Sequence, residues 1–169
     1  MGKKFYRQKM GIPQGSVVST LLCNILYADL EKEELPFVNS DEGLLLRLID
    51  DFLFISMNKD HATQFLNYMH QGFPEYGCSV NMTKSLANFD VAINMQKVPR
   101  LQGTTLFPFC GSLIDTQTLD VFKDASRMEG TRIYLWRSHL TVAIMDTLKV
   151  ERAQNPGKAL IVKTLKYYV

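Results

Sequence analysis

The sequence is poor in the features that define several large classes of protein. Its three cysteines, Cys23, Cys78 and Cys110, are widely spaced and form no CxxC pair. No histidine cluster accompanies them, so neither a zinc site nor a disulfide framework is expected, and we interpret them as reduced core residues. Apolar runs fall far short of the ~20 residues that span a bilayer. The first residues also lack the apolar core of a signal peptide, so no membrane partner is predicted.

Neither sign of charge predominates, with 19 Lys and Arg residues against 17 Asp and Glu residues. The formal net charge is +2, and hydrophobic residues make up 46% and charged residues 21% of the 169 residues, as in ordinary globular proteins. This length can bury a core and fits one domain or part of a larger one. Basic residues gather only near the two ends, where each group is either a solvated face or a contact to phosphates.

Apolar periodicity predicts two helices in the first half of the chain. A stripe at helical spacing follows Ser16 and is ended by Pro36; it consists of Val18, Leu21, Leu22, Ile25, Leu26 and Leu30. A second helix is expected from an Asp60 cap to Gly72, with Ala62, Phe65, Leu66 and Met69 on one face.

The rest of the chain reads as strands followed by helices. Extended segments are expected over 78–81 and 84–89, a surface connection over 90–103, and a hairpin pairing 106–114 with 119–122 across 115–118. Helical periodicity returns over 140–150 and near 159–167. This order of elements indicates an α+β fold.

Two adjacent aspartates are the most informative feature. Asp50 and Asp51 lie between the apolar runs 44–49 and 52–55, which predicts that they form the tip of a tight β-hairpin. Like charges this close raise each other's proton affinity, and a hard divalent cation such as Mg²⁺ would relieve the repulsion. The alternative is a solvated turn between core strands. Arg47, in the first strand, either pairs with a carboxylate or approaches a phosphate.

A turn-rich loop precedes the first helix. Gly11 and Gly15 allow close approach of a ligand or backbone, and Pro13 stiffens the loop. Gln14 carries an amide that both donates and accepts hydrogen bonds, and Ser16 can cap a helix whose N-terminus favours anions. The alternative is a loop that only caps the helix.

The order of this loop, a helix and an apolar Asp-Asp hairpin resembles the palm of a reverse transcriptase. Residues 11–16 resemble the loop that contacts template and incoming nucleotide, and residues 44–53 resemble the metal-binding hairpin. Within that family the chain looks most like the telomerase reverse transcriptases. Three segments carry this likeness: 45–53; 72–81 followed by Lys84; and 109–116, which resembles the primer-grip hairpin.

The resemblance implies a fold and an activity. Residues 1–124 would form a partial polymerase palm of antiparallel β-hairpins packed by helices, and residues 125–169 the helical start of a thumb. The chain would be part of an RNA-directed DNA polymerase, a nucleotidyltransferase that extends chromosome 3′ ends by copying a bound RNA. Its partners would be the telomerase RNA template, a single-stranded telomeric DNA primer and deoxynucleoside triphosphates, in a ribonucleoprotein at chromosome ends in the nucleus.

The resemblance also implies residue roles. Asp50 and Asp51 would be catalytic and hold metal, in a site for two Mg²⁺ ions, and Lys84 would protonate the leaving pyrophosphate. The nucleotide and template would be bound by Gly11, Pro13, Gln14, Gly15 and Ser16. The primer grip would comprise Phe109, Cys110 and Gly111.

The family's third carboxylate lies on a strand upstream of the glycine loop, and this sequence contains no match to it. We therefore expect part of a larger enzyme, inactive alone, whose Asp-Asp hairpin faces an unpaired, aggregation-prone sheet edge. Two alternatives remain. One is a reverse transcriptase of a mobile element or group II intron. The other is a non-catalytic nucleic-acid-binding remnant of such a palm.

Overall fold

The computed structural model describes residues 7, 9, 11, 18–39, 43–127 and 160–168. The helical elements are α1 (Ser19–Glu34), η1 (Pro36–Asn39), α2 (Lys59–Gln71), η2 (Pro74–Tyr76), η3 (Met82–Lys84) and η4 (Ala125–Arg127). The strands are β1 (Gly43–Leu48), β2 (Asp51–Ser56), β3 (Cys78–Val80), β4 (Leu86–Ala87), β5 (Ala92–Ile93), β6 (Gln96–Lys97), β7 (Leu106–Phe109), β8 (Ser112–Asp115), β9 (Val121–Lys123) and β10 (Leu160–Tyr168). The predicted α+β class is confirmed. Within these ranges, no helix is both long and apolar enough to cross a bilayer.

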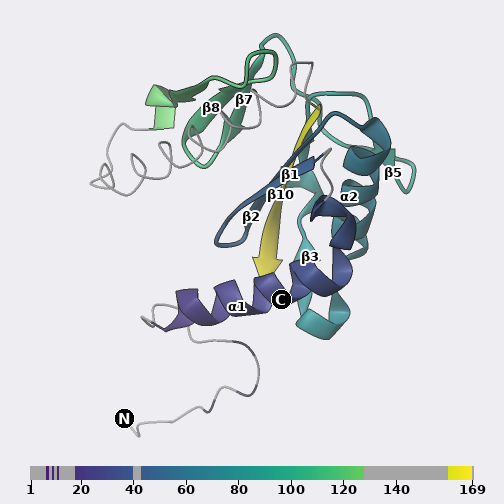
Figure 1. Ribbon diagram of the computed structural model, residues 1–169, viewed down its shortest axis with the longest axis vertical. Helices are drawn as coiled ribbons and strands as arrows, with labels where there is room; N and C mark the ends of the chain where they lie inside the picture. The colour runs from purple at the N-terminus through teal and green to yellow at the C-terminus, as the bar shows by residue number, and fades with distance from the viewer. Residues whose placement is uncertain are drawn as a thin grey trace, which may run out of the picture.

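An antiparallel sheet forms the centre of the fold, with the order β1-β2-β10-β3 and with β4 also paired to β10. Figure 1 shows α2 along one side of this sheet, and β7 and β8 on the other. β1 is half-buried along its length, whereas β2 is buried from Phe52 to Ser56. A strand buried on both faces reads as a continuous apolar run, as β2 does.

Alternate residues of β2 enter two separate cores. Phe52 and Phe54 pack toward α2, where Phe54 stacks on Phe65 with ring centroids 5.0 Å apart. Leu53 and Ile55 pack instead toward the small sheet β7-β8-β9. We call these the helix-side core and the sheet-side core. The period-two geometry of a strand thus divides one apolar run between two layers.

Local signals set the ends of α2, with one difference from prediction. Asn58, not Asp60, is the N-cap: its side chain accepts hydrogen bonds from the amides of Asp60 and His61. Asp60 falls in the first turn, where a negative charge favours the helix dipole. Gly72 ends the helix as predicted, at φ 73°, and a Cβ there would lie 3.0 Å from the Cys78 carbonyl oxygen. The predicted apolar face of α2 is confirmed as buried.

The predicted stripe on α1 is only partly buried. Leu30 is fully buried and Leu26 half-buried, but Val18, Leu21, Leu22 and Ile25 are exposed. The buried residues of α1 lie in its second half, where Tyr27 meets Phe52 edge-on. Helical spacing determines that apolar residues share a face, but it does not determine what covers that face.

Two predictions about the end of the chain are wrong. Residues 160–168 form strand β10, not a helix, and β10 pairs with β2, so the Asp-Asp hairpin has no open edge at β2. β-branched Ile161, Val162 and Thr164 suit a strand that packs on both faces. The predicted helix over 140–150 lies outside the described residues, and the division into palm and thumb stays a prediction.

The segment 106–123 forms one more strand than predicted. The chain turns at Cys110 and Gly111, so β7 and β8 make a hairpin before β9 is reached. Both turn residues have positive φ, 48° and 80°, as a two-residue type I′ hairpin requires. The predicted surface connection over 90–103 also contains a small hairpin, β5-β6, and buries Ile93 and Val98.

Candidate active site

The Asp-Asp pair lies at the β1-β2 hairpin, one residue out of its predicted place. Leu48 pairs with Asp51, so the two turn residues are Ile49 and Asp50, and Asp51 begins β2. The left-handed backbone conformation falls on Ile49, at φ 56°, rather than on an aspartate. A β-branched residue there is a strained exception. The prediction that both aspartates form the tip is therefore corrected: Asp50 is in the turn and Asp51 is in the strand.

Asp51 is half-buried and in contact with the predicted primer-grip turn. The Cys110 thiol donates a hydrogen bond to Asp51 Oδ2 at 3.1 Å. Burial raises the pKa of Asp51, as does the charge of Asp50, while the Cys110 hydrogen bond and the charges of Lys163 and Lys84 lower it. Burial and the nearby Asp51 raise the pKa of Cys110, which therefore remains a protonated donor.

Sequence reasoning placed Lys163 only in the basic group near the end of the sequence and gave it no role at Asp51. Its ammonium donates to the Pro108 carbonyl oxygen at 2.8 Å and lies 5.8 Å from the centre of the Phe107 ring. The same charge acts on Asp51. No local sequence pattern predicts that the charge of Lys163 acts on Asp51, because β10 is separated from β2 by about a hundred residues of sequence.

Lys84, the predicted proton donor, ends η3 and is exposed. Asn81 shapes this turn by accepting a hydrogen bond from the Thr83 amide at 2.9 Å. The next residue, Ser85, is buried, and its hydroxyl is hydrogen-bonded to His70 Nε2 at 2.8 Å. Burial also lowers the pKa of His70. The segment that carries Lys84 is thus joined to α2 by the hydrogen bond between His70 and Ser85.

The predicted nucleotide loop is largely outside the described residues. Gly11 is exposed with φ 76°, which suits its predicted freedom of conformation. Pro13, Gln14, Gly15 and Ser16 lie outside the described part, and so does the predicted Ser16 cap. Helix α1 begins after Val18, which makes no side-chain cap.

The residues around Asp51 do not fit a divalent metal site. Within the described ranges, no group of three or more His, Cys, Asp or Glu residues is placed to hold a metal ion. Asp51 accepts a hydrogen bond from a thiol, the positive charge of Lys163 acts on it, and the position opposite it on β10 is Leu165. Mg²⁺ is commonly held by one or two carboxylates, with waters and phosphates completing its octahedron, so the thiol, the positive charge and the apolar cross-strand position are what disfavour a site here.

Arg47 supports the hairpin from within β1. Its guanidinium donates to Glu31 and, at 2.9 Å, to Asn24 Oδ1, both on α1, and lies 5.2 Å from the centre of the Tyr27 ring. Of the two alternatives left open by the sequence, the structure therefore supports pairing with a carboxylate. The result is that α1 is fixed to the strand that leads into Asp50 and Asp51.

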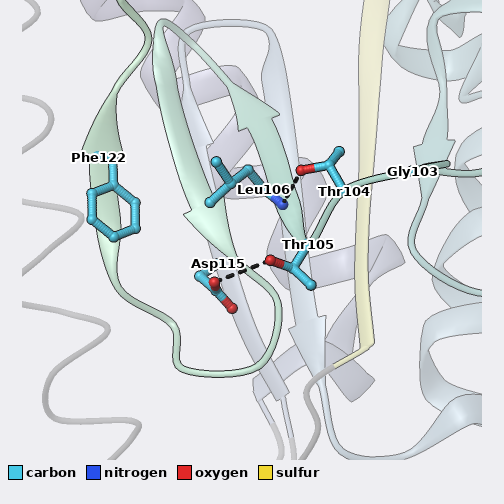
Figure 2. Close-up of a pocket in the computed structure, with 6 residues that line it drawn as sticks. All are labelled: Gly103, Thr104, Thr105, Leu106, Asp115 and Phe122. Atoms are coloured by element: carbon cyan, nitrogen blue, oxygen red, sulfur yellow. Dashed lines mark hydrogen bonds between the residues drawn. The ribbon is translucent and has the colours of Figure 1, made fainter.

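A hollow of about 770 Å³ lies away from Asp51, beside the small sheet. Figure 2 shows that Thr105 points toward Asp115 across its floor while the Phe122 ring lies to one side. Its polar groups already bond one another: the Thr105 hydroxyl donates to Asp115 Oδ2 at 3.1 Å, and the Leu106 amide donates to Thr104 Oγ1 at 3.0 Å. Because these polar groups are already hydrogen-bonded to one another, we assign the hollow no ligand.

Comparison with known proteins identifies the class. The family model described as reverse transcriptase (RNA-dependent DNA polymerase) matches residues 2–108, and the chain belongs to that family. Within the family it is similar to telomerase reverse transcriptases, which confirms the resemblance seen in the sequence. The cattle (Bos taurus) protein is 45% identical over 136 residues, 79% of this chain, and the mouse (Mus musculus) protein is 44% identical over 136 residues, also 79%.

The similarity extends beyond animals but covers a small part of each relative. The rice (Oryza sativa subsp. japonica) telomerase reverse transcriptase is 34% identical over 167 residues, which is 89% of this chain. The chain spans only 12% of the length of each of these three relatives. The activity of the whole relatives therefore applies to this chain only as a proposal.

Proposed function

We propose that this chain is the palm segment of an RNA-directed DNA polymerase that extends chromosome 3′ ends by copying a bound RNA. The observation that carries the proposal is the contact between Cys110, in the segment matching the primer grip, and Asp51. In a polymerase the primer end must be held next to the catalytic carboxylates. A rigid hairpin bonded to one of them suits that task.

The reaction would be nucleotidyl transfer, in which the primer 3′-hydroxyl attacks the α-phosphate of a deoxynucleoside triphosphate and pyrophosphate leaves. Phe109, Cys110 and Gly111 would place the primer end, and Gly11, Pro13, Gln14, Gly15 and Ser16 would position nucleotide and template. Lys84 would donate a proton to the pyrophosphate. Its exposed side chain and fixed turn support that role.

The family implies dependence on a divalent metal, with Asp50 and Asp51 as ligands. The described residues supply two of the carboxylates but no third. Because the chain spans only 12% of the length of the cattle, mouse and rice relatives, we assign catalysis to a longer polypeptide that contributes a third carboxylate. Its proposed partners are the telomerase RNA template and a single-stranded telomeric primer, at chromosome ends in the nucleus.

The test is primer extension by the longer protein, assembled with its template RNA. Asp51→Ala should reduce extension of a telomeric primer by far more than the ~10–100-fold typical of losing a supporting contact. Asp90→Ala is the matched control, because Asp90 is 82% exposed and pairs only with the exposed Arg100 among the described residues. It should leave extension unchanged.

Two outcomes would replace the proposal. Efficient copying of unrelated RNA templates, with no preference for the bound one, would favour a mobile-element or group II intron enzyme. Nucleic-acid binding that is the same with and without Mg²⁺, with no extension and no effect of Asp50→Ala, would favour a non-catalytic remnant of the palm.

A further inference from the structure

Strand β10 occupies the middle of the central sheet. On one edge, residues 160–165 pair with β2 in the register Leu160 with Ser56 through Leu165 with Asp51. On its other edge, β10 pairs with β4 and then with β3. Figure 1 shows it running between the β1-β2 hairpin and β3. Both edges of β2 are consequently paired within this chain.

The fit of β10 is specific rather than incidental. Ile161 is fully buried in the sheet-side core and Val162 is fully buried in the helix-side core. The backbone of Ile161 bonds to Asn88 in both directions: its amide donates to Asn88 Oδ1 at 2.8 Å, and its carbonyl accepts from the Asn88 amide at 3.0 Å. Two buried side chains on opposite faces fix the register, because a slip of one residue would exchange them.

What β10 brings to Asp51 is unsuited to a metal. Lys163 contributes a positive charge that acts on Asp51, and the register position directly opposite Asp51 is Leu165. The hydroxyl of the preceding residue, fully buried Thr164, has no hydrogen-bond partner among the described residues. Cross-strand partners have Cβ atoms about 4.5–5.5 Å apart, so the register makes position 165 the one at which to test an added carboxylate.

We propose that β10 is an occluding strand, which closes the sheet beside Asp51 and so keeps this chain a folded domain that binds no divalent metal at Asp50 and Asp51. The proposal concerns the same carboxylates as the proposed function and rests on it for their role as metal ligands. The occupant of the position is this chain's own segment 160–168. Access to the metal-binding arrangement then requires β10 to leave the position next to β2.

The test is a gain of metal binding in the 169-residue chain. Mn²⁺ is the probe, measured by calorimetry and by its electron paramagnetic resonance signal, because carboxylate sites that hold Mg²⁺ also accept Mn²⁺. The unaltered chain should bind Mn²⁺ no better than its Asp51→Asn variant does. Leu165→Asp should tighten binding by about tenfold or more, because affinity in such sites rises with the number of charged ligands.

Two controls make the gain diagnostic. Leu165→Asn has the same size without the charge and should show little gain, and Asp51→Asn in the Leu165→Asp background should abolish the gain. A folded Leu165→Asp variant that binds Mn²⁺ no more tightly than the unaltered chain overturns the proposal. So does an unaltered chain that binds Mn²⁺ through Asp51.

A second measurement needs no variant and holds even if Leu165→Asp fails to fold. Amide hydrogen exchange should protect residues 160–165 to the same degree as β2. Unprotected amides there, with β2 still protected, would overturn the proposal. These readouts are separate from primer extension by the longer protein, so the inference and the proposed function fail independently.

Discussion

At the scale of single residues, the site is fixed by polar contacts that no spacing rule reveals. Cys110 was expected to be a core thiol or part of a grip, and it is the hydrogen-bond donor to Asp51. Arg47 lies in an apolar strand because Glu31 and Asn24 on α1 neutralise and bind it. The sequence showed which residues are chemically able to act at the site. It could not show which side chains they contact, because those side chains come from distant segments.

Arg47 should contribute more to stability than an exposed arginine does. Its side chain is 16% exposed and that of Glu31 is 26% exposed, so solvent screens the pair poorly. We expect Arg47→Met to lower the free energy of unfolding by about 2 kcal/mol, measured by urea denaturation. Arg100→Met is the matched control: Arg100 is 48% exposed beside Asp90, and its loss should cost less than about 1 kcal/mol. Equal losses would contradict this interpretation.

Asp115 should give the protein an acid-dependent term in stability. Hydrogen bonds from the Gln117 amide, and then from the Thr118 amide and Thr105 hydroxyl, hold its pKa below the usual value of 3.8. A lowered folded-state pKa means that the contribution is complete above about pH 4 and is lost as the pH falls through the folded pKa.

The measurement compares urea unfolding of Asp115→Asn with the unaltered chain at two pH values. At pH 7 the variant should be less stable by about 1 kcal/mol, and near pH 2 the difference should largely vanish. Asp90→Asn, which removes an exposed carboxylate, provides the control. A difference that is independent of pH would show that the charge of Asp115 is not responsible.

At the scale of elements, local signals predicted α2 and the β1-β2 hairpin well. Asn58 and Gly72 define α2 through their own side chain and backbone, so the helix was readable to within a cap residue. The resemblance implied a hairpin within 109–116, but the residue pattern alone missed the turn at Cys110 and Gly111, because an apolar run surrounds it and only one of its residues is a glycine. The helical interpretation of 159–167 was wrong, because the spacing of its apolar residues fits a helix or a strand and pairing with β2 favours the strand.

Within β10, the Thr164 hydroxyl should be a cost rather than a benefit. It is fully buried without a hydrogen-bond partner among the described residues, so Thr164→Val should raise the free energy of unfolding by about 1 kcal/mol. The matched comparison is Ser56→Ala, which also removes a buried hydroxyl. That hydroxyl accepts a bond from the Asn58 amide at 3.0 Å, so its loss should destabilise. If both substitutions shift the midpoint of thermal unfolding in the same direction, the Thr164 hydroxyl is not destabilising for the reason given.

At the scale of the whole molecule, β2 and β10 join the two cores into one unit. Ile161 lies in the sheet-side core, and its neighbour Val162 lies in the helix-side core. We expect Ile161→Ala to lower the free energy of unfolding by about 2–5 kcal/mol. The decrease should be the same whether unfolding is followed through α2 or through the sheet-side core. Far-UV circular dichroism would report α2, and methyl signals in NMR would report the sheet-side core.

The control is Ile25→Ala on α1, where the side chain is 59% exposed and its loss should change stability by less than about 0.5 kcal/mol. Helical signal from α2 that survives after the sheet-side core has unfolded would show that the cores are independent. Coincident transitions would support a single cooperative unit.

The sequence by itself determined the family, the α+β class, and the Asp-Asp hairpin as the place to look, because those depend on residue chemistry and short-range periodicity. Only the tertiary structure decided that the Cys110 thiol bonds to Asp51, that the charge of Lys163 acts on Asp51, and that β10, not an open edge, lies beside β2. Backbone pairing between strands depends on which segments approach, and β2 and β10 approach across about a hundred residues. No local pattern records such a choice, since the same apolar residues would satisfy a helix or a strand until their neighbour is fixed.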